Sequence, residues 1–166
     1  MTHDRTPQQG LQVHDSAGVI APPPLIYGIG FALALMLNRL MPIPIARHHK
    51  RACRATGLVL ATLGLGISAA VVRGFRAAGT SISTTRPTSR LVCTGPFRFS
   101  RNPDYIGQLL VYVGASAGSN SWWPILIAPF ALGLIQRGVL RREERYLEKK
   151  FGQEYRDYAA NVHRWI

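Results

Sequence analysis

The chain has 166 residues, about the length of one domain, and carries 20 Lys and Arg against 8 Asp and Glu, a formal charge of +12. Such a charge first suggests a nucleic-acid binder, but no nucleic-acid-binding motif is present and the apolar residues form long uncharged blocks. Two cysteines without a Cys-x-x-Cys spacing exclude a disulfide framework and give no sign of a metal site. The composition therefore predicts an integral membrane protein with neither nucleic acid nor metal as a partner.

The first 20 residues are polar and lack the basic region followed by an apolar region that marks a cleavable signal. We interpret residues 1–20 as a disordered N-terminal tail. Residues 21–166 are then expected to form a single membrane domain.

Four apolar segments follow this tail and predict an all-α, multi-pass fold. An α-helix needs roughly 20 apolar residues to cross a bilayer. The expected transmembrane segments are residues 24–41, 55–72, 103–118 and 122–140. Small residues in the second segment indicate close helix packing, because Gly64-Leu-Gly66 has no preceding strand that would make it a dinucleotide loop.

Basic residues predict the orientation of these segments, because Arg and Lys concentrate on the cytoplasmic side of membrane proteins. The connector 73–104 and the region after residue 137 share one side and hold most of the basic residues. We therefore expect both in the cytoplasm. The connector 42–54 must then face the opposite side although it also carries Arg47, Lys50 and Arg51.

The third segment has a clear helix-start signal at Asn102-Pro103, a favoured N-cap residue followed by a favoured first helical residue. Arginines precede it, so its free N–H groups and these arginines are expected to attract anions. The short Gly118–Ser121 link predicts an antiparallel hairpin of segments three and four. The hairpin would bring Asn102 and Tyr105 near residues 137–144.

After the hairpin the sequence becomes amphipathic over residues 141–166, with Gly152 suited to end a helix. One interpretation is a cytoplasmic helical region that lies on the membrane surface. The alternative is a lid over the loop 86–105. The surface helix alone does not explain the adjacent carboxylates Glu143 and Glu144 at the membrane exit.

The run Gly95–Gly107 (GPFRFSRNPDYIG), followed by Glu143-Glu144 and by Phe151–Tyr155 (FGQEY), resembles the isoprenylcysteine carboxyl methyltransferase family, to which the phospholipid methyltransferases are related. The resemblance covers residues 79–166. It implies a membrane enzyme that binds S-adenosylmethionine at the cytoplasmic ends of its last helices and takes a lipophilic acceptor from the bilayer. The implied cofactor-binding residues are Leu91, Val92, Phe97, Arg101, Asn102, Pro103, Tyr105, Glu143 and Glu144.

Two positions depart from the family pattern. Asn102 stands where the family usually has His, so no imidazole base is available there, and Phe97 in place of Tyr lacks one hydroxyl. The resemblance favours carboxyl O-methylation, because an ionised carboxylate needs no base. Arg137 and Arg142 are the expected catalytic residues that orient such an acceptor, with Arg141 as an alternative. Phospholipid amine N-methylation and a non-catalytic membrane scaffold remain the other two hypotheses.

Overall fold

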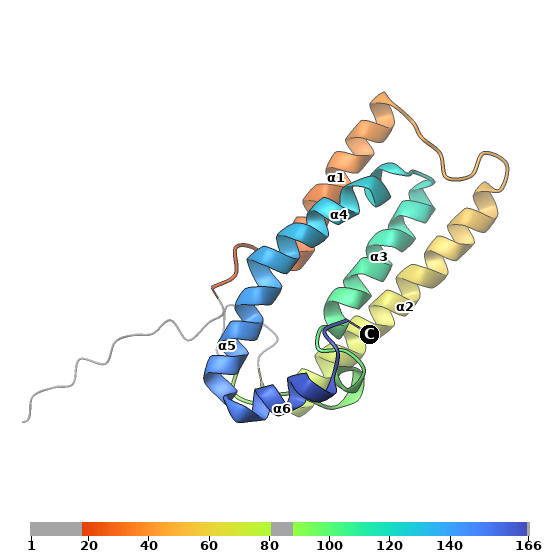
Figure 1. Cartoon of the computed structure of the whole chain (residues 1–166). Helices are drawn as coiled ribbons and strands as arrows, with labels where there is room; N and C mark the ends of the chain where they lie inside the picture. The colour runs from red at the N-terminus through yellow and green to blue at the C-terminus, as the bar shows by residue number, and fades with distance from the viewer. Residues whose placement is uncertain (1–17, 81–87, 166) are drawn as a thin grey trace, which may run out of the picture.

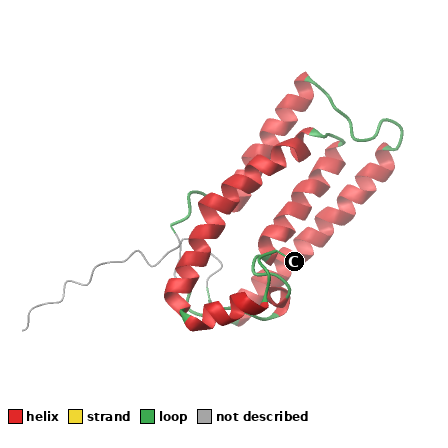
Figure 2. Ribbon diagram, in the orientation of Figure 1, coloured by secondary structure: helices red, strands yellow, loops and turns green. Residues whose placement is uncertain are grey.

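The computed structural model describes residues 18–80 and 88–165, and all the regular secondary structure in these ranges is helical (Figure 2). The all-α prediction is therefore confirmed for the described residues. Residues 1–17 of the expected tail and residues 86–87 of the expected cofactor loop lie outside them.

Eight elements follow in chain order: α1 (Pro23–Leu40), α2 (Lys50–Ala77), the 3₁₀ turn η1 (Gly95–Arg98), α3 (Pro103–Ser119), α4 (Trp123–Ile135), the π-helical segment η2 (Gln136–Leu140), α5 (Arg141–Phe151) and α6 (Gln153–Asn161). Three described helices are long and apolar enough to cross a membrane, namely α1, α2 and the combined helix Trp123–Phe151. The bounds of α1 and α3 agree with the predicted segments within a residue. Helix α2 is longer than the predicted 55–72, because charged residues extend it at both ends.

The long helices form a bundle in which α2 packs along α3 and α1 packs along α4 (Figure 1). Helices α3 and α4 are joined by a tight turn in which Asn120 has a left-handed conformation, with φ 51°. The predicted hairpin is therefore present. Its two helices pack less against each other than against their neighbours, α3 against α2 and α4 against α1. Short α6 runs across the end of the bundle at which α3 begins (Figure 1).

The contact of α2 with α3 depends on glycines that let the two backbones approach closely. A Cβ added at Gly57 would lie 2.5 Å from the Gly114 carbonyl oxygen, and one at Gly107 would lie 2.8 Å from the Gly64 carbonyl oxygen. Neither distance is compatible with a side chain. The small residues of α2 thus have the packing role that the sequence predicted.

No break in the helix occurs at residue 140, where the sequence analysis placed the end of the fourth segment. Helix α4 continues through η2 into α5 without a break, so Trp123–Phe151 is a single helix of 29 residues, about 43 Å long at 1.5 Å per residue. The sequence analysis placed a membrane segment at 122–140 and an amphipathic region from 141. In the structure the backbone stays helical across this boundary, and the change lies in polarity, because α5 is far more polar than α4. Gly152, with φ 55°, ends α5 as expected.

The start of α3 differs from the prediction in one respect. Pro103 is the first helical residue, but the Asn102 side chain makes no capping hydrogen bond. Its Nδ2 instead donates to the Arg164 carbonyl oxygen at 2.9 Å. The capping prediction is wrong because a partner 62 residues away in the sequence takes the amide group.

The expected tail is also shorter than 1–20. Ile20 N donates to the Gly138 carbonyl oxygen at 3.4 Å, and Arg142 donates to the Gly18 carbonyl oxygen at 2.6 Å. Val19 packs against the buried core of α1, α3 and α4. Residues 18–20 therefore belong to the folded domain.

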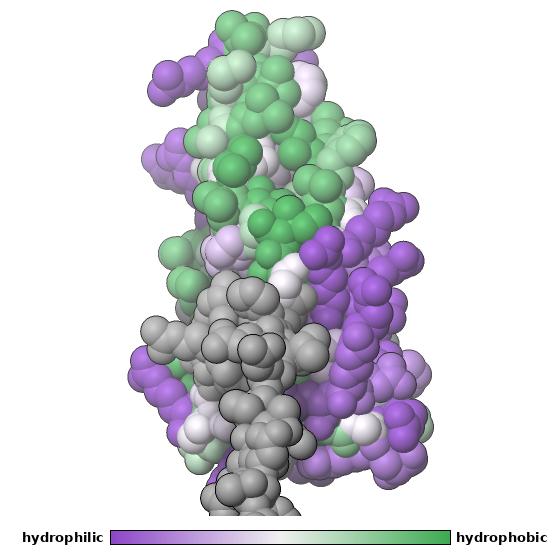
Figure 3. Space-filling model, turned by 90° about the vertical axis from the view of Figure 1, so that its left-hand side faces the viewer, coloured by the Kyte–Doolittle hydropathy of each residue, from purple (hydrophilic) through white to green (hydrophobic). Residues whose placement is uncertain are grey.

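The surface separates into an apolar and a polar part (Figure 3). Large apolar side chains are exposed on α1, α2 and α4, including Leu33, Leu63 and Phe130. The exposed side chains of α5 are instead mainly basic. This division is expected of a bundle whose longer helices lie in lipid and whose α5 and α6 end meets water.

Candidate active site

A cavity of about 400 Å³ lies at the polar end of the bundle, between the start of α3, the end of α2, α5 and α6. All nine residues that the sequence analysis assigned to the cofactor line it: Leu91, Val92, Phe97, Arg101, Asn102, Pro103, Tyr105, Glu143 and Glu144. Its volume is within the range of roughly 300–1,000 Å³ that small-molecule sites occupy. The fold therefore brings the two distant motifs to one place.

Tyr105 and Glu143 join α3 to α5 at the inner wall of this cavity. The Tyr105 hydroxyl donates a hydrogen bond of 2.8 Å to Glu143 Oε2. Tyr105 is 7% exposed, so this bond satisfies a buried hydroxyl and one oxygen of a half-buried carboxylate. The second carboxylate oxygen of Glu143 remains available to a ligand.

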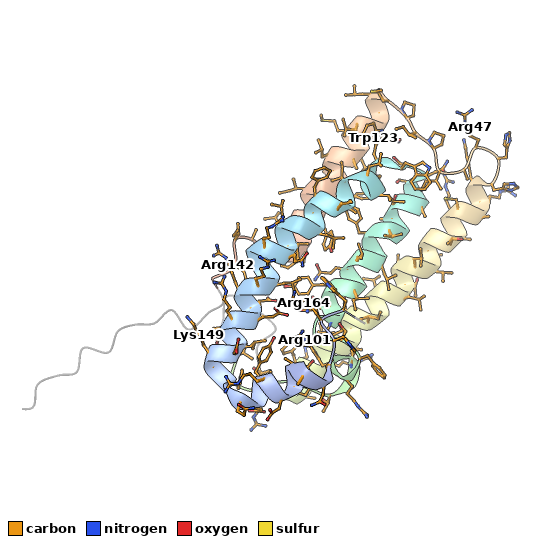
Figure 4. The ribbon with its side chains drawn as sticks, in the orientation of Figure 1. Arg47, Arg101, Trp123, Arg142, Lys149 and Arg164 are labelled. Atoms are coloured by element: carbon orange, nitrogen blue, oxygen red, sulfur yellow. The ribbon has the colours of Figure 1, made fainter. Side chains whose placement is uncertain are left out.

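Glu144 has a different environment from Glu143. Arg164 donates to both of its oxygens, at 2.9 and 2.6 Å, and Arg101 lies 3.7 Å from Oε1. Both arginines point into the space between α5 and the base of α3 (Figure 4). Glu144 is thus held by two guanidinium groups from outside its helix, and not by the neighbouring arginines of α5.

The last described residues, 162–165, fasten the C-terminal region to the loop before α3. Arg101 N donates to the His163 carbonyl oxygen at 2.9 Å, and Ser100 Oγ donates to the Arg164 carbonyl oxygen at 3.2 Å. The Asn102 amide donates to the same carbonyl. These bonds attach the residues that follow α6 to the loop beside the cavity.

Aromatic side chains cover the cavity on the side of α6. Tyr158 donates a hydrogen bond of 2.8 Å to the Phe97 carbonyl oxygen, and the Phe97 ring packs edge-on against Phe75 at the end of α2. Burial is the main cause that raises the pKa of Tyr158 above its ordinary value, so its hydroxyl stays protonated and remains a donor. Tyr155 is buried beside Tyr158.

The two residues expected to be catalytic lie elsewhere. Neither Arg137 nor Arg142 lines the cavity. Arg142 points to the outer side of α5, where it bonds the Gly18 carbonyl oxygen (Figure 4). Arg137 is exposed on η2. Among the described residues, the arginines that line the cavity are Arg90 and Arg101.

In the comparison with known protein families, the model described as phospholipid methyltransferase matches residues 52–154. The chain belongs to the phospholipid methyltransferase family. The matched range begins in α2 and ends in α6, and so includes most of the cavity lining. The resemblance derived from the sequence motifs is thereby confirmed at the level of the family.

Among curated relatives, the cobalt-zinc-cadmium resistance protein CzcN of Cupriavidus metallidurans is 33% identical over 105 residues, which cover 63% of this chain and 47% of that protein. The nickel-cobalt-cadmium resistance protein NccN of Alcaligenes xylosoxydans xylosoxydans is 32% identical over 77 residues, covering 46% of this chain and 36% of the relative. An uncharacterized protein of Haemophilus influenzae is 35% identical over 65 residues, 37% of this chain and 98% of its own length. The chain thus spans about half or less of the two metal-resistance proteins. No solved structure matches it significantly.

The structure adds cavity residues that the motif had not singled out. Asp104 and Gln108 stand on the first turns of α3, and Gln108 Nε2 donates to Asp104 Oδ2 at 2.7 Å. Their i, i+4 spacing could have revealed this pair, because such residues are neighbours on a helix. The other additions come from elements whose arrangement the sequence did not define: Pro22, Pro23, Pro24, Val71, Phe75, Thr88, Arg90, Tyr146, Leu147, Tyr155 and Tyr158.

Among the described residues, the charged members of the cavity wall are Arg90, Arg101, Asp104, Glu143 and Glu144. Arg101 and the nearby Arg164 compensate Glu144. Within the described part of the chain, Asp104 and Glu143 have no basic side chain at ion-pair distance. The formal charges of the wall and Arg164 balance, but these two carboxylates without a basic partner suit a positively charged group of a ligand.

Proposed function

We propose that this member of the phospholipid methyltransferase family is an S-adenosylmethionine-dependent methyltransferase that acts on a lipid-borne acceptor. The observation that carries the proposal is the shared cavity: the nine residues that the motif resemblance implied as cofactor-binding all line it. Its position at the polar end of three membrane-length helices suits a water-soluble donor and a membrane-dissolved acceptor.

For the topology, we propose four crossings, with α3 as the fourth. Helix α3 has 17 residues, about 26 Å, and is covered along its length by α2, so its shortness is tolerated within the bundle. The balance of basic residues favours the cavity and α6 on the cytoplasmic side. The connector 42–54 also carries basic residues, but fewer than the connector 73–104 and the region after residue 137 carry together.

The cavity residues fit the chemical groups of S-adenosylmethionine. A donor with a sulfonium and an ammonium suits a site with uncompensated carboxylates, and Glu143 offers a free oxygen to the ammonium or a ribose hydroxyl. Phe97 and Tyr105 supply aromatic faces for a flat base or a cationic sulfur. The N–H groups at the start of α3 suit the cofactor carboxylate.

The bound donor would supply a methyl group already activated for direct displacement. The protein therefore has to align the acceptor and exclude water, more than to provide acid–base groups. The cover formed by α6 and the loop 95–102 suits exclusion of water. Arg90, which is exposed at the cavity wall, is the basic residue best placed to orient an anionic acceptor.

We place carboxyl O-methylation first, since an ionised carboxylate is a nucleophile without help from a base. Amine N-methylation is the second candidate, and one observation favours it. Asp104 and Glu143 are carboxylates without a basic partner among the described residues, so either could accept the proton that an ammonium must lose.

Two measurements test the proposal. Calorimetry in detergent should show heat on adding S-adenosylmethionine or its demethylated product, and its absence in folded protein would favour a scaffold without turnover. Membranes incubated with methyl-labelled donor then separate the reactions. Label in base-labile esters indicates carboxyl methylation, and label in lipid headgroups indicates amine methylation.

A further inference from the structure

From the geometry of Asp104 and Gln108 we infer an ammonium-binding subsite on the α3 wall of the cavity. The inference rests on the proposed function, because it assigns these two residues a ligand group within the same site. Its chemical class is a primary ammonium, which either the methyl donor or an amine headgroup of a lipid acceptor could supply.

The first observation is the state of the Gln108 amide. Its Nε2 donates to Asp104 Oδ2 at 2.7 Å, and since a carboxylate only accepts, this bond fixes which end of the amide is nitrogen. Its carbonyl oxygen, Oε1, is buried and has no hydrogen-bond partner. A buried acceptor without a donor is unfavourable, so a donor from outside the chain would stabilise this oxygen.

The second observation is the charge of Asp104. Gln108 is its hydrogen-bond partner, and in the described ranges no Lys, Arg or His lies within ion-pair distance of it. Glu144, by contrast, binds two guanidinium groups, and Glu143 already accepts from Tyr105. Asp104, like Glu143, thus accepts from one neutral donor and has no ion pair among the described residues.

Apart from the second N–H of Gln108 Nε2, the groups that these two side chains leave unbonded are acceptors. Oε1 shares a carbon with Nε2, so it lies beside the carboxylate to which Nε2 donates, and both residues line the cavity. An ammonium has three N–H donors, one positive charge and no acceptor, and can satisfy both groups at once. A carboxylate or phosphate would be repelled here, and a neutral hydroxyl would leave the charge of Asp104 uncompensated.

The test uses four purified proteins in detergent: the wild type, Asp104→Asn, Gln108→Met and the control Asp157→Asn. Asp157 forms the same type of pair, accepting from Gln153 Nε2 at 2.7 Å, but it is exposed on α6 and outside the cavity lining. S-adenosylhomocysteine carries the ammonium, and methylthioadenosine shares its nucleoside and thioether but lacks the amino-acid portion. Affinities for both are measured by calorimetry.

If the cofactor supplies the ammonium, Asp104→Asn and Gln108→Met each weaken S-adenosylhomocysteine binding by about tenfold or more, and methylthioadenosine binding is unchanged. If a lipid supplies it, both nucleosides bind as in wild type. A short-chain phosphatidylethanolamine then loses affinity in both variants, whereas the matched phosphatidylethanol does not. The Asp157→Asn control should match the wild type throughout.

Equal losses for ligands with and without the ammonium, or unchanged affinity for all four, would overturn the subsite. Failure of the proposed function looks different, because the wild type itself would then bind neither nucleoside. In that case the comparison of the two lipids alone tests the subsite. A loss of affinity for phosphatidylethanolamine but not for phosphatidylethanol supports it, and equal affinities in the variants and the wild type reject it.

Discussion

The Tyr105 hydroxyl and the Glu143 carboxylate lie 2.8 Å apart, although 38 residues separate them in the sequence. This bond joins the start of α3 to α5 and sets the distance between the two motifs that define the cavity. The Tyr105 hydroxyl is buried and Glu143 is half-buried, so the bond replaces water that the hydroxyl cannot reach.

Tyr105→Phe should therefore destabilise the fold by about 1–3 kcal/mol, the cost of leaving a buried acceptor without its donor. Thermal unfolding in detergent measures the loss. A double-mutant cycle with Glu143→Gln should give a coupling energy of about 0.5–3 kcal/mol, as for residues in direct contact. Additive effects of the two changes would mean that the bond contributes nothing to stability.

Glu143→Ala should weaken binding of S-adenosylmethionine by about 1.5–3 kcal/mol, the range for hydrogen bonds to charged groups. The matched control is Glu148→Ala, since Glu148 is on the same helix but is exposed and outside the cavity lining. Calorimetry on both folded variants decides the matter. Wild-type affinity in the Glu143 variant would remove that residue from the site.

Arg164→Ala should loosen residues 162–165 at the cavity edge, while the bonds to the His163 and Arg164 carbonyl oxygens remain possible. It removes both hydrogen bonds to Glu144 and should cost about 1–3 kcal/mol, because Glu144 is largely shielded from water. Hydrogen exchange should increase at the Arg101 amide, which donates to His163. Arg156→Ala, which breaks an exposed pair with Glu148 at 3.9 Å, should cost at most about 1 kcal/mol and leave that amide protected.

Gly114→Ala should destabilise the bundle by about 1–3 kcal/mol, because the new methyl group would lie 2.5 Å from the Gly57 carbonyl oxygen. Gly66→Ala is the control on the partner helix, where an added Cβ meets nothing within 4 Å. This change should be neutral or stabilising by up to about 1 kcal/mol. Similar unfolding temperatures for the two variants would show that α2 and α3 are not in such close contact.

The sequence predicted the helical class and the bounds of α1 and α3, because uncharged apolar blocks are local signals. The nine residues that line the cavity were implied by the family resemblance. It did not predict what the Asn102 amide binds. Its partner, the Arg164 carbonyl, comes from the far end of the chain, and the choice between a local cap and a distant acceptor depends on tertiary structure.

Tertiary structure also explains why Arg137 and Arg142 do not line the cavity. Arg137 and Arg142 lie in the correct part of the sequence, but helical rotation through η2 and α5 turns them away from the cavity. A π-helical segment rotates every later residue about the helix axis, relative to its place in a regular α-helix. The residues Gln136–Leu140 themselves do not predict that they form such a segment. The pairing of Asp104 with Gln108 could have been predicted from their i, i+4 spacing. The aromatic side chains of α6 that cover the cavity could not have been predicted in this way.

The unbroken helix Trp123–Phe151 has a mechanical consequence. In a bilayer, helix tilt adjusts to the thickness of the surrounding hydrocarbon. Because the backbone is helical throughout, a tilt of the apolar half would also displace the carboxylates of α5 relative to α3. The shape of the cavity would then depend on the thickness of the bilayer.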